Sequence, residues 1–235
     1  MYGDVFCRVY NELGWNFYPE AFAGQLLQWL KAQGAEVKTA LDLGCGTGVL
    51  CRILSDSGIE TAGMDLSAGM IAIAREMDPQ GRYDVADMVT YRPERKFDLV
   101  TCTGDALNHI PALSDVETIL RNVHGYLREG GWLVFDILNE KEVSDSEPFE
   151  LDFDEQTHVW FQMTRPDAKS VELKIRVWEA GILKCEETIP ETIHDPDVIC
   201  GMLREIGFRT VRCAHSLTEA GNQATTWFVT AQRCV

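Results

Sequence analysis

The chain has 235 residues, of which 46% are hydrophobic and 25% charged, and its 37 acidic residues against 21 lysines and arginines give a net charge of −16. This length predicts one α/β domain with room for a smaller appended element. The acidic balance disfavours nucleic acid and anionic membrane surfaces as partners, because both are bound mainly through Lys and Arg.

The compartment is predicted from what the sequence lacks. No apolar run approaches the ~20 residues that a membrane span needs, and the first ten residues contain no apolar segment typical of a secretory signal. No two of the eight cysteines have the two-residue separation common in zinc sites. We therefore expect a cytoplasmic protein with reduced cysteines, no metal, and no nucleic-acid or membrane partner. The oligomeric state stays open.

The first half of the chain alternates between two patterns. The first ~35 residues, rich in aromatic side chains, are predicted to be helical. Short apolar runs at 39–43, 60–64, 83–85, 97–102 and 132–137 predict strands. Amphipathic stretches lie between them, one capped at its start by Ser67 and another over 115–127. This alternation predicts parallel strands joined by right-handed crossovers, which form a doubly wound sheet.

The pattern changes after residue 140. Strands predicted at 158–164, 171–179 and 182–189 are separated by turn residues, which indicates an antiparallel meander. A helix over 196–206 ends at Gly207, and strands near 209–214 and 225–231 complete the main sheet as a hairpin. We thus predict N-terminal helices and a ligand-binding core over 1–139, an antiparallel insertion over 140–193, and a C-terminal helix with the last strands over 194–235.

The predicted insertion is strongly acidic. Residues 140–197 contain 16 acidic and 6 basic side chains, a net charge of −10. Two interpretations stay open: steering of a cationic or amine-bearing substrate, or a solvated acidic face that keeps the protein in solution.

The strongest functional signal is the glycine-rich segment 42–48, Asp-Leu-Gly-Cys-Gly-Thr-Gly, at the end of the first predicted strand. Its glycines allow a tight turn and close approach of a ligand, at the sheet edge where open α/β folds bind ligands. A dinucleotide fingerprint would place its third glycine at position 49, which is Val49. Asp42 would repel a pyrophosphate and attract a ligand with an ammonium or sulfonium group. The segment therefore favours a cationic nucleoside over a dinucleotide.

Segment 42–48 resembles motif I of the class I S-adenosylmethionine-dependent methyltransferases. Four further segments, in the family's order and spacing, are similar to its later motifs: 63–70, 86–88, 97–100 and 127–133. The resemblance covers roughly residues 39–137. It implies a Rossmann-like methyltransferase fold, namely a doubly wound, mostly parallel seven-stranded sheet, here with a small antiparallel β insertion as a lid.

The resemblance also implies roles for individual residues. Asp65 would accept hydrogen bonds from both ribose hydroxyls, although it could instead only favour the start of the next helix. Asp87 would meet the adenine amino group, or alternatively cap its own loop. The other residues assigned to cofactor binding are Tyr10, Tyr18, Asp42, Gly44, Cys45, Gly46, Leu66, Met88 and Thr103.

The aromatic and histidine assignments each keep an alternative. Tyr10 or Tyr18 would close over the cofactor. Alternatively, the N-terminal aromatic side chains pack in the hydrophobic core. His109 lies in the loop that the resemblance places under the transferred methyl group, as a general base or as a structural histidine at a helix start.

The sequence thus predicts a methyltransferase that uses S-adenosyl-L-methionine and acts on a small-molecule acceptor, an amine or a hydroxyl, by in-line displacement. The alternatives are methylation of a protein or tRNA, a protein that binds the cofactor without catalysis, and a nicotinamide-dependent oxidoreductase.

Overall fold

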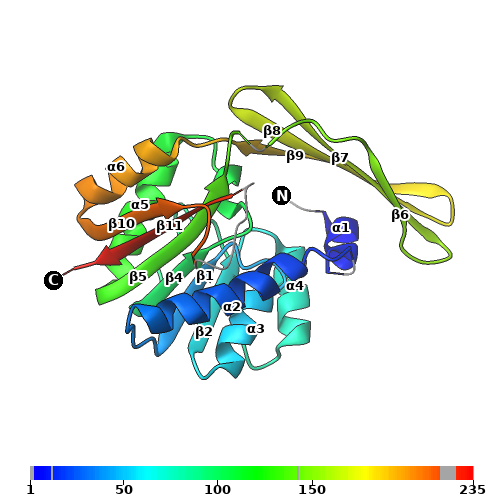
Figure 1. Cartoon of the computed structure of the whole chain (residues 1–235). Helices are drawn as coiled ribbons and strands as arrows, with labels where there is room; N and C mark the ends of the chain where they lie inside the picture. Colours follow the sequence, from blue (N-terminus) through cyan, green and yellow to red (C-terminus); the bar gives the residue numbers. More distant parts are fainter. Residues whose placement is uncertain (1–2, 12, 142, 218–225, 235) are drawn as a thin grey trace.

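The computed structural model describes residues 3–11, 13–141, 143–217 and 226–234. Its centre is a seven-stranded sheet in the order β10-β11-β5-β4-β1-β2-β3 (Figure 1). The strands are β1 (Thr39–Leu43), β2 (Glu60–Asp65), β3 (Arg82–Val85), β4 (Phe97–Cys102), β5 (Leu127–Leu138), β10 (Phe208–Ala214) and β11 (Thr226–Arg233). Strands β1 to β5 are mutually parallel, whereas β11 runs antiparallel to both β5 and β10.

Helices cover both faces of this sheet. α2 (Phe17–Ala32) and α3 (Val49–Asp56) pack on one face, where Leu26, Leu50 and Trp132 share a buried cluster. α5 (Leu113–Tyr126) and α6 (Pro196–Ile206) cover the other face around Val100 and Phe135. Buried side chains therefore alternate between faces along each strand, which fixes the strand register.

The doubly wound, mostly parallel seven-stranded fold is confirmed, and several predicted boundaries are close to the observed ones. α6 begins at Pro196 and ends at Ile206, and Ser67 caps α4 (Ala68–Met77) by accepting a hydrogen bond from the Met70 N–H. β5 begins five residues earlier than predicted, because Leu127 already pairs with Phe97 before the apolar run starts at Trp132. Thr225, the predicted start of the last strand, lies outside the described residues.

A second sheet of four antiparallel strands has the order β6-β7-β8-β9. Three of them, β7 (Thr157–Asp167), β8 (Ser170–Glu179) and β9 (Ile182–Thr192), extend the predicted meander. β6 (Phe149–Asp152) was not predicted, since two of its four residues are acidic and give no apolar run. Figure 1 shows α1 (Asp4–Val9) beside this sheet. Phe6 and Val9 pack there against Ile175 and Val177.

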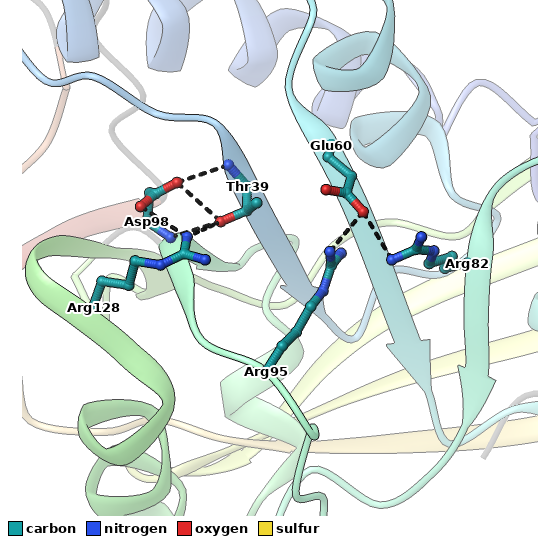
Figure 2. A network of polar contacts seen from close by, with 6 residues as sticks. All are labelled: Thr39, Glu60, Arg82, Arg95, Asp98 and Arg128. Carbon is teal, nitrogen blue, oxygen red and sulfur yellow. Dashed lines mark hydrogen bonds and ion pairs between the residues drawn. The ribbon is translucent and has the colours of Figure 1, made fainter.

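Polar contacts tie the amino ends of the parallel strands together (Figure 2). The Asp98 carboxylate accepts hydrogen bonds from the Lys38 and Thr39 N–H groups at 3.0 and 2.9 Å, and Arg128 lies 3.0 Å from its other oxygen. On the neighbouring strands, Glu60 forms ion pairs with Arg82 and Arg95. These acids are therefore paired at the amino edge of the sheet. The acids of the candidate site lie at the opposite, carboxyl edge.

Candidate active site

The glycine turn between β1 and α3 has a backbone that side chains would obstruct. Gly44, Gly46 and Gly48 all have positive φ, at 71°, 52° and 76°. A Cβ at Gly44 would lie 2.7 Å from the Cβ of Ala106, whereas one at Gly46 would meet nothing within 4 Å. The turn is thus closely packed beneath Gly44 and open above Gly46.

Two predicted carboxylates lie at the ends of β1 and β2. Asp65 accepts hydrogen bonds from the Gly46 N–H at 2.9 Å and the Ser67 N–H at 2.8 Å, which holds its carboxylate beside the glycine turn. Asp42 is buried and accepts a 2.7 Å hydrogen bond from the Thr101 hydroxyl. Burial raises the pKa of Asp42 to about 7, although the Thr101 hydrogen bond opposes this shift. Asp42 therefore supports the turn from below, and Asp65 lies at its surface.

The loops after β2 and β3 bring further predicted residues to the same edge. The Met88 Cε would lie 3.6 Å from a Cβ at Gly44, and Leu66 keeps 49% of its surface exposed. Asp87 is exposed and accepts a hydrogen bond from the Val89 N–H at 2.8 Å, so it does cap its own loop. Cys45 differs from these residues, because its side chain is buried in a cluster with Cys51. Only the backbone of Cys45 is available at the turn.

The sequence prediction missed a buried carboxylate, Asp136, near the end of β5. It accepts hydrogen bonds from the Gly104 N–H at 3.1 Å, the Asp105 N–H at 3.0 Å and the Tyr18 hydroxyl. These bonds fix the loop after β4, where Asp105 has a φ of 60°. Its signal in the sequence was an acid inside the apolar run 132–137.

Tyr10 and Tyr18 approach the edge from the N-terminal segment. The Tyr10 ring lies 5.2 Å from that of Trp15, and burial, followed by the charges of Asp105 and Asp65, raises its pKa. Tyr10 thus contributes to an aromatic cluster and also lies near both acids. Tyr18 is held by Asp136. Thr103, the remaining predicted residue, is partly buried in the loop after β4.

The second sheet is attached to this edge through a short 3₁₀ helix, η1 (Ala106–His109). The side-chain amide of Asn108 donates a 2.7 Å hydrogen bond to the carbonyl of Thr192, and its oxygen accepts one from the Leu138 N–H at 3.2 Å. His109 Nδ1 lies 3.5 Å from the Pro190 carbonyl, and burial lowers the pKa of His109. β9 is thereby fixed next to the loop after β4.

The site combines a glycine turn and several acids at the carboxyl edge of a doubly wound sheet. It can hold a nucleoside ligand that carries positive charge: the Asp65 carboxylate lies partly buried beside the turn, and the space above Gly46 is open. Among the described residues, no three His, Cys, Asp or Glu side chains are grouped so that they could hold a metal ion. None of the described helices is long and apolar enough to cross a membrane.

The comparisons with known proteins identify the family. The chain belongs to the methyltransferase domain family, whose model matches residues 15–211. It is 26% identical to YqeM of Bacillus subtilis, which carries the name of a methyltransferase, over 97% of this chain and 96% of that protein. A ubiquinone biosynthesis O-methyltransferase of Hydrogenovibrio crunogenus is 33% identical, over 46% of this chain and 45% of that protein.

A solved structure has the same fold. The chain matches CalS10, an amino pentose methyltransferase of Micromonospora echinaspora with bound S-adenosylmethionine, with a TM-score of 0.77 and 20% identity over 99% of this chain and 98% of that one. The protein is accordingly a class I S-adenosylmethionine-dependent methyltransferase, and S-adenosylmethionine is its cofactor. This family membership decides against a nicotinamide-dependent oxidoreductase.

Proposed function

We propose that the protein transfers a methyl group to the nitrogen or oxygen of a small molecule bound between the β4–η1 loop and the second sheet. The observation that carries this proposal is the attachment of β9 to η1 through Asn108. It places the second sheet next to the loop after β4, at the carboxyl edge of the main sheet. An acceptor held by two elements that meet at this edge is more readily a small molecule than a folded protein or tRNA.

The cofactor-binding residues are proposed from the geometry of the glycine turn. Asp65 has two carboxylate oxygens at the surface of the turn, which suits two neighbouring ribose hydroxyls. Gly44 and Gly46 would adjoin the amino-acid part, and Met88 and Leu66 the base. When bound, S-adenosylmethionine supplies a methyl group on a positively charged sulfur. The chain's own contribution is to orient the acceptor in line and to exclude water.

His109 is proposed as a residue that contacts the acceptor. Its lowered pKa keeps the imidazole neutral near pH 7, and the Pro190 carbonyl beside Nδ1 favours the tautomer in which Nε2 is unprotonated. A neutral Nε2 can accept a hydrogen bond from a hydroxyl or an ammonium acceptor.

The test separates acceptor classes by the release of S-adenosylhomocysteine. The purified chain and its Asp65→Asn variant are each incubated with S-adenosylmethionine and one of three acceptor fractions. The fractions are small metabolites, proteins and bulk tRNA. We expect product only with the small-molecule fraction, and a roughly tenfold or larger rise in the cofactor KM for Asp65→Asn. The matched control is Asp56→Asn, which alters an exposed acid at the end of α3 opposite the glycine turn. Product formed only with protein or tRNA would refute the proposal.

A further inference from the structure

The carboxyl group of Asp105 has no partner to balance its charge. The Asp105 N–H donates a hydrogen bond to the Asp136 carboxylate. Within the described part of the chain, however, no group donates a hydrogen bond to the Asp105 carboxyl or forms an ion pair with it. Burial, followed by the charges of Asp136 and Glu191, raises its pKa well above the ordinary value. Two acids act electrostatically on this partly buried carboxyl, and the described residues supply no counter-charge, so a cation bound here would be stabilised.

Glu191 is the second such acid and comes from a different element. It lies in β9 between Pro190 and Thr192, the two residues whose carbonyls approach η1. Burial raises the pKa of Glu191 to about 7, and among the described residues no cation or hydrogen-bond donor meets its side chain. The second sheet and the β4–η1 loop, which are joined at η1, therefore each carry one acid for which the described residues supply no partner.

The described side chains that act on this pair or lie beside it on η1 carry no permanent positive charge. Asp105 acts electrostatically on Tyr10, which follows α1, and on Tyr18, at the start of α2. On the β5 side lies Asp136, whose pKa is raised by burial, although its three hydrogen bonds oppose this shift and favour the charged form. His109 on η1 is held neutral by burial. Because Asp136 is stabilised as the anion and Asp105 is not, Asp105 holds the proton that the two acids share in the absence of a cation.

We propose that Asp105 and Glu191 together bind the protonated amino group of the acceptor, which makes an amine, rather than a hydroxyl, the methylated group. This inference rests on the proposed function and specifies its substrate class. An ammonium offers up to three N–H donors and a positive charge to two carboxylates, whereas a hydroxyl offers a single donor and no charge.

The same pair prepares the nitrogen for attack. One N–H bond breaks, its proton passes to a carboxylate oxygen of Glu191, and the electron pair stays on nitrogen. That pair forms the new N–C bond as the C–S bond breaks, and the sulfur keeps the C–S electrons. The product leaves as a methylated ammonium.

The test measures binding, so it needs no knowledge of the natural acceptor. Matched probes, D-glucosamine with D-glucose and n-butylamine with n-butanol, are titrated calorimetrically into the full chain saturated with S-adenosylhomocysteine. We expect each amine to bind at least tenfold more tightly than its hydroxyl partner. Repeating the titration in buffers of different ionisation enthalpy should show protons released on amine binding, because Asp105 and Glu191 give up protons when the cation arrives.

Three variants make the test specific. Asp105→Asn and Glu191→Gln should each weaken amine binding about tenfold or more and reduce the proton release, with affinity for S-adenosylhomocysteine changed less than twofold. Asn tolerates the positive φ of residue 105, so this variant keeps the loop. Glu186→Gln is the control, because Glu186 is an exposed acid of the same strand that pairs with Arg176 at 2.7 Å; it should leave both readouts unchanged.

The outcomes separate the two proposals. Equal affinities within each probe pair, failure of both amines to bind, or amine binding that ignores Asp105→Asn and Glu191→Gln would overturn the ammonium site while leaving methyl transfer intact. Failure of the native chain to bind S-adenosylhomocysteine would instead contradict the proposed function.

Discussion

The substitution Asp136→Asn tests whether the buried carboxylate of β5 holds the loop after β4. Asp136 has no exposed surface and accepts three hydrogen bonds: its Oδ2 from Gly104 and Tyr18, its Oδ1 from Asp105. Asn fills the same volume but has one oxygen instead of two. Whichever way the amide is turned, its NH₂ group faces the N–H of Gly104 or of Asp105. The Tyr18 hydroxyl can rotate to accept, but a backbone N–H cannot.

The expected cost follows from that count. One buried N–H group is left without an acceptor, which costs about 1–3 kcal/mol. A value of about 2 kcal/mol corresponds to roughly a 30-fold change in the folding equilibrium. Tyr18→Phe removes a single donor and leaves both backbone N–H groups satisfied, so it should cost only about 0.5–1.5 kcal/mol.

Urea unfolding of the native chain and both variants measures this difference, with the slope on denaturant checked for constancy. Calorimetry with S-adenosylhomocysteine reports whether the loop still supports the cofactor site, and we expect weaker binding for Asp136→Asn than for Tyr18→Phe. An Asp136→Asn variant as stable as the native chain would refute the reasoning. It would mean that Asp136, not Asp105, carries the shared proton and already presents one neutral oxygen.

Three further predictions concern the glycine turn and the two ends of the sheet. Gly44→Ala should lower the free energy of unfolding by more than about 1 kcal/mol, because its Cβ meets Ala106, whereas Gly46→Ala should mainly weaken cofactor binding. Urea unfolding and calorimetry measure the two effects, and a larger loss of stability in Gly46→Ala than in Gly44→Ala would contradict this packing. Asp42 keeps its proton in the folded state up to about pH 7 but loses it near pH 4 when unfolded, so the folded state binds more protons and stability falls as pH rises through that window. Compared with Asp42→Asn, the native chain should lose up to about 4 kcal/mol between pH 4 and 7, and parallel pH profiles would contradict this. Although burial raises the pKa of Asp98, the Lys38 and Thr39 donors and Arg128 lower it overall, so the stability it confers is present above about pH 4 and lost in acid. The stability advantage of the native chain over Asp98→Asn should therefore disappear as the pH falls below about 4. Circular dichroism during acid titration of both proteins measures this.

Local sequence patterns were sufficient to predict elements whose ends are set by residues close by in the chain. The helix over 196–206 has a capping acid, Asp195, before Pro196 and a glycine after its end, and each of these acts within a few residues. The order of strands and helices follows from hydrophobic periodicity, and the glycines of segment 42–48 predicted a tight turn, in which Gly44, Gly46 and Gly48 have positive φ.

Short charged elements and distant contacts were beyond the sequence. β6 has little apolar character of its own and forms because β7 offers a partner. Likewise, the sequence left open whether Asp87 contacts the cofactor or caps its own loop. The structure shows the loop cap, because the Val89 N–H donates a hydrogen bond to the Asp87 carboxylate.

The sequence by itself determined the doubly wound core, the antiparallel meander and the glycine turn after β1, since these depend on periodicity and on residues close together in the chain. Only the tertiary structure decided that Asp136 fixes the loop at Asp105, and that the charge of Glu191, from a distant part of the sequence, acts on Asp105. The charge of a buried acid depends on what surrounds it in space, and that information is present only after the chain has folded.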